Sequence, residues 1–123
     1  MVSREVLLPV PPVAVWDSLT RPDELSSWLG SQVELDLRPG GVLRLNADGI
    51  ARMGVVEAVS PFEYLSFRWR PLVAGLHGPI LGPGTRVEFA LEAEGEGTRL
   101  RVVESGFGAA SISRAMASSA VAT

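Results

Sequence analysis

The chain has 123 residues, of which 46% are hydrophobic and 20% charged, a balance typical of a globular domain and not of a disordered segment. Its net charge is −3, and its 11 cations are all arginine and scattered, which excludes the clustered positive charge that binds nucleic acids or anionic membranes. The absence of cysteine and lysine excludes thiolate and Schiff-base chemistry, and a single histidine, His77, excludes a histidine-rich metal site. We therefore predict one domain over residues 1–123 with no metal or cofactor.

The first residues show no targeting signal. Residues 1–5 are charged and lead into only three apolar residues before Pro9, unlike a secretory signal peptide. No apolar run approaches the roughly 20 residues that cross a membrane. A cytoplasmic location is the resulting expectation, with no membrane and no nucleic acid as partner.

The first third of the chain predicts one strand and two helices. Residues 4–8 are typical of a short strand that ends at Pro9, and the prolines at 11 and 12 favour a helix start. Thr20 or Asp23 is a candidate cap for the second helix, which ends at Gly30. The apolar positions expected to share a helix face are Val13, Trp16 and Leu19, followed by Leu25, Trp28 and Leu29.

From residue 31 the hydrophobic period changes to two, which predicts half-buried strands joined by turns. The turns fall at residues 38–41, 47–49 and 94–97, and the Gly/Pro-rich segment 71–84 is expected to be a long connection. Residues 109–121 are predicted to form a terminal helix. The fold class is α+β: a curved antiparallel sheet of about six to seven strands with its helices on one face.

Several segments together resemble a known superfamily. They are residues 15–30 (VWDSLTRPDELSSWLG), 36–41 (DLRPGG), 57–61 (EAVSP) leading to 67–69 (FRW), 84–89 (GTRVEF), 97–100 (GTRL) and 104–107 (ESGF). In this order they resemble the SRPBCC or START-like superfamily, and within it the branch of domains similar to an activator of the heat shock protein 90 ATPase. The resemblance covers roughly residues 4–107 and implies the helix-grip fold, in which a curved sheet and helices enclose a cavity.

The resemblance implies a fold and leaves the function open, because members include lipid and hormone binders, polyketide cyclases and chaperone activators. Members usually end in a long amphipathic helix that closes the cavity. Here that helix is unusually short, about 13 residues or roughly 20 Å. An incomplete lid, a lid supplied by a second subunit and a truncated chain all stay open.

The alternating strands supply candidate ligand-binding residues, because ligand cavities are concave and mostly apolar. The candidates are Leu43, Met53, Leu65, Phe67, Trp69, Phe89, Val102, Phe107 and Met116. The resemblance adds weight to Trp69, since this position often faces the pocket in the family. The structural alternative is that all of these side chains pack a solid core.

Two polar residues are weak catalytic candidates. If Leu100 and Val102 face inward, the two-residue period points Glu104 inward as well, where its carboxylate could bind or protonate a ligand. The alternative is a strand-end carboxylate in water or paired with an arginine. His77 can act as an acid or base without a triad, although a solvated loop histidine is the simpler interpretation.

Three hypotheses for the function follow. The first is binding of a small hydrophobic molecule in an apolar cavity, and the second is an enzyme similar to polyketide cyclases and dehydratases that uses Glu104 or His77. The third is a protein-interaction module, either a chaperone partner or a homodimer through residues 71–84 or the short terminal helix. The apolar side chains of residues 71–84 favour a pocket mouth or a dimer contact there.

Overall fold

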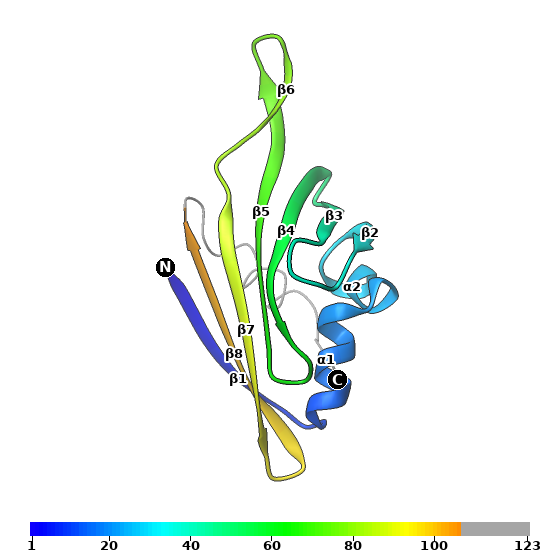
Figure 1. Cartoon of the computed structure of the whole chain (residues 1–123), viewed down its shortest axis with the longest axis vertical. Coiled ribbons are helices and arrows are strands. Elements are labelled where there is room, and N and C mark those ends of the chain that lie inside the picture. Colours follow the sequence, from blue (N-terminus) through cyan, green and yellow to red (C-terminus); the bar gives the residue numbers. More distant parts are fainter. Residues whose placement is uncertain (107–123) are drawn as a thin grey trace.

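A computed structural model describes residues 1–106 of the chain, which form two helices and a sheet (Figure 1). The helices are α1 (Pro12–Thr20) and α2 (Pro22–Trp28). The strands are β1 (Val2–Leu8), β2 (Ser31–Leu35), β3 (Val42–Ala47), β4 (Ile50–Ser60), β5 (Tyr64–Gly75), β6 (Gly78–Leu81), β7 (Thr85–Glu94) and β8 (Gly97–Gly106). The expected terminal helix over 109–121 lies outside the described residues. Neither described helix is long and apolar enough to cross a membrane.

The strands form one antiparallel sheet in the order β1-β8-β7-β5-β4-β3-β2. From β2 to β8, strands that follow each other along the chain lie side by side, apart from β6, which pairs only with β5. Strand β1 then lies beside β8 (Figure 1). The predicted α+β class with an antiparallel sheet is confirmed, since consecutive short turns favour this arrangement.

Residues 71–84 differ from the expected loop. Strand β5 continues to Gly75, turns through two residues and returns as β6, which extends beyond the other strands (Figure 1). Gly78, directly after the turn, has a φ of 124°, a conformation that glycine adopts readily. The Gly/Pro content of this segment predicted a loop, but Gly75 and Gly78 flank a tight turn between the end of β5 and the short strand β6.

One face of the sheet carries the core, and we call it the inner face. Its buried side chains come from β3, β4, β5, β7 and β8, and they pack with α1 and α2. A shift of register in β4 between Val56 and Ala58, typical of a β-bulge, lies between β3 and β5. Such irregularities bend a strand and increase its twist, which helps the sheet to wrap around the helices.

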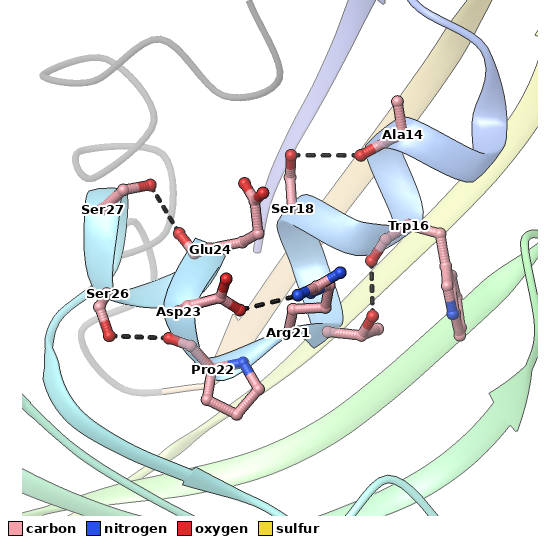
Figure 2. A network of polar contacts seen from close by, with 10 residues as sticks. Ala14, Trp16, Ser18, Arg21, Pro22, Asp23, Glu24, Ser26 and Ser27 are labelled. Atoms are coloured by element: carbon pink, nitrogen blue, oxygen red, sulfur yellow. Dashed lines mark hydrogen bonds and ion pairs between the residues drawn. The ribbon is translucent and has the colours of Figure 1, made fainter.

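A side-chain hydrogen bond joins the two helices. The indole Nε1 of Trp28 in α2 donates to the backbone oxygen of Ser18 in α1 over 2.9 Å. Within α1, Thr20 Oγ1 donates to the Trp16 oxygen over 2.7 Å. Figure 2 shows other local bonds around the junction, among them the bond from Ser18 Oγ to the Ala14 oxygen. The expected side-chain caps are absent from α2: Thr20 bonds backward along α1, and Asp23 pairs with Arg21 instead.

One of the three α1 residues predicted to face the sheet is exposed instead. Trp16 and Leu19 are buried as expected, but Val13 is 51% exposed and Val15 takes the buried place. Val13 lies in the first turn after Pro12, where the chain arrives from β1. A three-residue spacing alone could not tell which neighbouring position points to the sheet.

Candidate functional site

The register of the sheet brings most predicted inward residues into rows across the inner face. One row joins Leu65 of β5, Phe89 of β7 and Val102 of β8. The next joins Phe67, Val87 and Glu104, and the third joins Trp69, Thr85 and Gly106. Directly paired residues share a face, so these rows are layers of one surface.

The aromatic side chains of this surface contact each other. The ring centroid of Phe67 lies 5.4 Å from that of Trp69, in an edge-to-face arrangement, and 6.2 Å from that of Phe89. Such pairs add about 0.5–1.5 kcal/mol beyond the area they bury. Leu43 of β3 pairs with Gly54 on the same face and is also buried. The inward orientation predicted for Leu43, Leu65, Phe67, Trp69, Phe89 and Val102 is confirmed.

The orientation predicted for Met53 is wrong. Met53 pairs with Arg44 on one side and Arg70 on the other, on the outer face, and is 39% exposed. Its neighbours Arg52 and Gly54 take the inward positions of β4. Phe107 and Met116 lie outside the described residues.

The two catalytic candidates lie in different places. Glu104 is 1% exposed and lies on the inner face beside Val87. His77 is exposed in the turn between β5 and β6, far along the hairpin from the row of Glu104. The structure therefore places only Glu104 on the surface that the apolar candidates form.

A polar chain of three side chains crosses the inner face near the hairpin end. Trp69 Nε1 donates to Thr85 Oγ1 over 2.9 Å, and Thr85 Oγ1 donates to Glu104 Oε2 over 2.7 Å. An indole N–H can only donate, so the threonine hydroxyl accepts from it and directs its own proton at the carboxylate. The guanidinium of Arg52 lies 4.6 Å from the Trp69 ring, within the range of a cation–π contact.

We call this cluster the polar end (Arg52, Trp69, Thr85 and Glu104). Its four residues come from four different strands, β4, β5, β7 and β8. Sequence reasoning missed Thr85 and Arg52. Thr85 lies two residues before Val87 and four before Phe89, so the two-residue alternation of the strand could have predicted that it faces inward. No pattern indicated Arg52, because residues 50–59 show no regular two-residue alternation of apolar and polar side chains.

The polar end has limited metal-binding capacity. Thr85 and Trp69 offer one hydroxyl and an N–H, and the described residues contain no cluster of three or more His, Asp or Glu side chains that could hold a metal ion. The cluster is suited instead to holding a polar group of an organic molecule, because carboxylate, hydroxyl and guanidinium together supply acceptors and donors.

The helix end of the inner face is closely packed. An apolar cavity of about 10 Å³ lies between the two helices and the sheet. It is lined by Leu19, Leu25, Leu29, Leu35, Leu43, Leu65, Phe67 and Phe89. Its volume is close to the minimum for one water molecule, so the described side chains form a core at this end. The polar end differs from this core because it combines hydrogen-bonding groups with apolar side chains, and it is the candidate site.

The outer face behind the polar end carries a network of ion pairs. Glu57 accepts from Arg68 Nε over 2.8 Å and from Arg86 Nε over 2.7 Å, and Arg86 also pairs with Glu88. A hollow of about 280 Å³ lies beside these arginines at the start of β7. The hydrogen bonds and charges of Arg68 and Arg86 hold the pKa of Glu57 below its ordinary value near 4.5.

We expect Glu57→Gln to change the acid limb of the stability curve. A lowered folded-state pKa stabilises the fold fully above the ordinary pKa, and this contribution is lost as the pH falls through the folded value. The carboxylate still contacts water, so the loss at pH 7 should be about 0.5–1 kcal/mol. Urea unfolding from pH 7 to pH 3 should show this difference shrink toward zero below pH 4.5, whereas a constant difference would contradict it.

Comparison with protein families gives a match over nearly the whole chain. Residues 9–121 match the family model described as Activator of Hsp90 ATPase homolog 1-like protein. The chain belongs to this family. The branch inferred from the sequence is thereby confirmed, while no curated protein sequence matches the chain.

Solved structures of the same fold agree with this assignment. MLL2253 from Mesorhizobium loti has a TM-score of 0.72 and 27% identity, covering 93% of this chain and 82% of its own. DynU16, from the dynemicin biosynthetic locus, has a TM-score of 0.73 and 28% identity, covering 95% of this chain. This chain spans only 42% of DynU16. The Aha1 dimer from Colwellia psychrerythraea, at a TM-score of 0.66 and 19% identity, covers 87% of this chain and 78% of its own and shares the fold.

Proposed function

We propose that this member of the Activator of Hsp90 ATPase homolog 1-like family binds a small hydrophobic molecule that carries one hydrogen-bonding group. The observation that carries the proposal is the burial of Glu104, which is 1% exposed on a face where most side chains are apolar and Arg52 and Thr85 are polar neighbours. Thr85 Oγ1 donates to its carboxylate over 2.7 Å, so a hydrogen-bonding group is held in place among apolar side chains. Ligand sites characteristically combine an apolar surface with a few such groups.

The apolar part of the ligand would lie along the rows that end at the polar end. Val87, Val102 and the Trp69 ring supply its contact surface. Each buried CH₂ group contributes about 0.8 kcal/mol, so a ligand with about ten carbons in two rings is large enough for micromolar binding. The occurrence of a structural relative in a biosynthetic locus supports a small molecule as the ligand.

The polar part of the ligand would meet Glu104. A carboxylate only accepts hydrogen bonds, so it favours a hydroxyl or amine over a second carboxylate. Thr85 and Trp69 hold the Glu104 side chain in place, because the chain of bonds ends on its Oε2. A donor group at one end of an apolar ligand is therefore the expected match.

A matched series of two-ring compounds tests this proposal. Naphthalene, 2-naphthol and 2-naphthoate have the same rings and differ in the polar group. We expect 2-naphthol to raise the Tm most and 2-naphthoate least, since a ligand that binds only the folded state stabilises it. No shift with any of the three, together with no retained molecule in native mass spectrometry of freshly purified protein, would contradict the proposal.

The variant Glu104→Gln sharpens the test. The amide keeps the size and one acceptor oxygen, so the preference for 2-naphthol over naphthalene should fall about tenfold in Kd, or about 1.4 kcal/mol. Glu88→Gln, on the outer face, is the matched control and should leave the preference unchanged. An unchanged preference in Glu104→Gln would remove Glu104 from the site.

Acid–base catalysis by Glu104 is a second candidate, similar to the cyclase and dehydratase members of the superfamily. The same burial favours it, because catalytic carboxylates are often placed in apolar surroundings. His77 does not lie near enough to share this role. A ligand retained by the wild-type protein but converted on incubation, and no longer converted by Glu104→Gln, would favour catalysis.

A further inference from the structure

The hollow of about 280 Å³ at the start of β7 gathers three arginines from different parts of the chain. Arg68 and Arg70 come from β5, and Arg86 comes from β7. Arg68 pairs directly with Arg86 on the outer face, and Arg70 lies two residues further along β5 on the same face. The arginines are scattered along the sequence, so the pairing of the strands is what places these three around one hollow. We call it the arginine hollow.

The arginine hollow stays open because two of its lining residues have no side chain. Gly84 and Gly106 lie next to each other, since a Cβ atom at Gly106 would lie 2.7 Å from the backbone oxygen of Gly84. A Cβ atom at Gly84 would lie 2.6 Å from Cγ of Arg70. Ser105, which pairs with Arg86, adds a hydroxyl to the lining. The space is therefore surrounded by guanidinium groups and one hydroxyl.

Contacts within the chain hold the three arginines in place. The Glu57 carboxylate accepts from Arg68 Nε over 2.8 Å and from Arg86 Nε over 2.7 Å. Like charges that lie directly opposite each other in a sheet repel, and Glu57 offsets this repulsion. Arg70 donates to the backbone oxygens of residues 81–82 over 3.0 and 2.9 Å. Groups that are fixed in advance lose little freedom when a ligand binds, which favours affinity.

The guanidinium groups have more donors than these contacts use, because each carries five N–H bonds. Among residues 1–106, Arg68 donates only from Nε, Arg70 from Nε and Nη2, and Arg86 from Nε and Nη1. The three guanidinium groups are accompanied by two carboxylates, those of Glu57 and Glu88. One positive charge is thus in excess here, although the whole chain has a net charge of −3.

We propose that the arginine hollow binds the carboxylate group of a small organic acid. Guanidinium groups pair with carboxylates through two parallel N–H···O bonds, and Glu57 already makes such charge-assisted bonds to Arg68 and Arg86. A carboxylate carries one negative charge and matches the excess, whereas a phosphate monoester carries about 1.5 to 2 at pH 7. The Arg68 side chain is 66% exposed, so salt screens the site and a Kd of about 1 mM is expected at low ionic strength.

An NMR titration with acetate tests the site, with acetamide as the uncharged molecule of similar shape. We expect acetate to shift the backbone amide signals of Gly84, Thr85, Ser105 and Gly106 along a saturating curve. Binding should weaken at least fivefold in 0.5 M sodium chloride, since the Debye length falls to a few ångströms. Equal shifts with acetamide, or tighter binding of inorganic phosphate than of acetate, would overturn the proposal.

Two variants and a matched control locate the binding. Arg68→Gln removes one guanidinium, and Ser105→Leu fills the space while keeping every charge, so each should raise the Kd for acetate at least fivefold. Arg101→Gln removes the same charge from the outer face beside Ala90, away from the hollow, and should leave the Kd within twofold. An equal loss in Arg101→Gln would show attraction by surface charge alone and overturn the proposal. So would unchanged binding in both Arg68→Gln and Ser105→Leu.

The arginine hollow is separate from the polar end and does not depend on the proposed function. Glu104→Gln should bind acetate as the wild-type protein does, so the failure of one proposal leaves the other standing. A site with a Kd of about 1 mM stays nearly empty at the micromolar concentrations that suit the naphthalene series. Any 2-naphthoate that binds Glu104→Gln but not Arg68→Gln is bound in the hollow.

Discussion

Trp69→Ala is expected to lower the free energy of unfolding by about 3–5 kcal/mol, the range measured for large-to-small changes of buried aromatic residues. Trp69 is 1% exposed, packs edge to face on Phe67 and lies under the Arg52 guanidinium. The substitution removes all of these contacts and leaves a cavity beside a buried carboxylate. Urea unfolding at pH 7 measures the change.

Trp69→Phe is the matched variant, because it keeps an aromatic ring and removes only the indole N–H and the second ring. The hydrogen bond to Thr85 Oγ1 is lost, so a smaller loss of about 1–2 kcal/mol is expected. Equal losses in the two variants would show that the hydrogen bond, and not the packed ring, carries the effect. A loss below 1 kcal/mol for Trp69→Ala would contradict the packing described for this face.

Gly54→Val should cost about 3 kcal/mol or more. A Cβ atom at Gly54 would lie 2.3 Å from the backbone oxygen of Arg68 and 3.0 Å from the Cβ of Trp69. The first contact is with backbone, so β4 and β5 would have to move apart, and overpacking that shifts side chains and backbone costs about 1–3 kcal/mol, occasionally more. Thermal and urea unfolding should both show the loss.

The control for this prediction is the adjacent residue. Met53→Val places the same side chain one position earlier in β4, on the outer face, where Met53 is 39% exposed. A change below 1 kcal/mol is expected there, as for most exposed positions. A larger loss in Met53→Val than in Gly54→Val would contradict the facing of β4.

The positions of the apolar residues in β5, β7 and β8 were predictable from the sequence. In these strands the two-residue period runs without interruption, from Leu65 to Trp69 and from Val87 to Leu91, and every second residue is buried. The same period placed Glu104 on the inner face, where it is found. Regular alternation was thus sufficient wherever a strand faces the core along its whole length.

Strand β4 was not predictable in this way. Two of its inward positions hold Arg52 and Gly54, one charged and one without a side chain, while the apolar Met53 and Val55 lie on the outer face. Arg52 is tolerated inside because its guanidinium lies against the Trp69 ring, a contact that depends on the register of two strands. Whether a charged residue such as Arg52 can face inward therefore depends on which strands pair and in which register, and a single sequence does not show this pairing.

The hairpin of residues 71–84 shows a different limit. Glycine and proline usually interrupt regular structure, but here Gly75 and Gly78 flank a two-residue turn and Pro79 lies within the returning strand. The Leu, Val and Ile residues between them were interpreted as an interaction surface from their composition. The face of the hairpin on which each of these side chains lies follows only from the strand pairing in the structure.

The pairing of β1 with β8 has a consequence for how the chain acquires this fold. Glu5 and Arg99 form an ion pair across the two strands although 94 residues separate them. During synthesis, β1 has no paired strand until β8, which is made more than 90 residues later, arrives. Contacts between distant parts of a chain form slowly, so the apolar side of β1 depends on this late closure for its protection from aggregation.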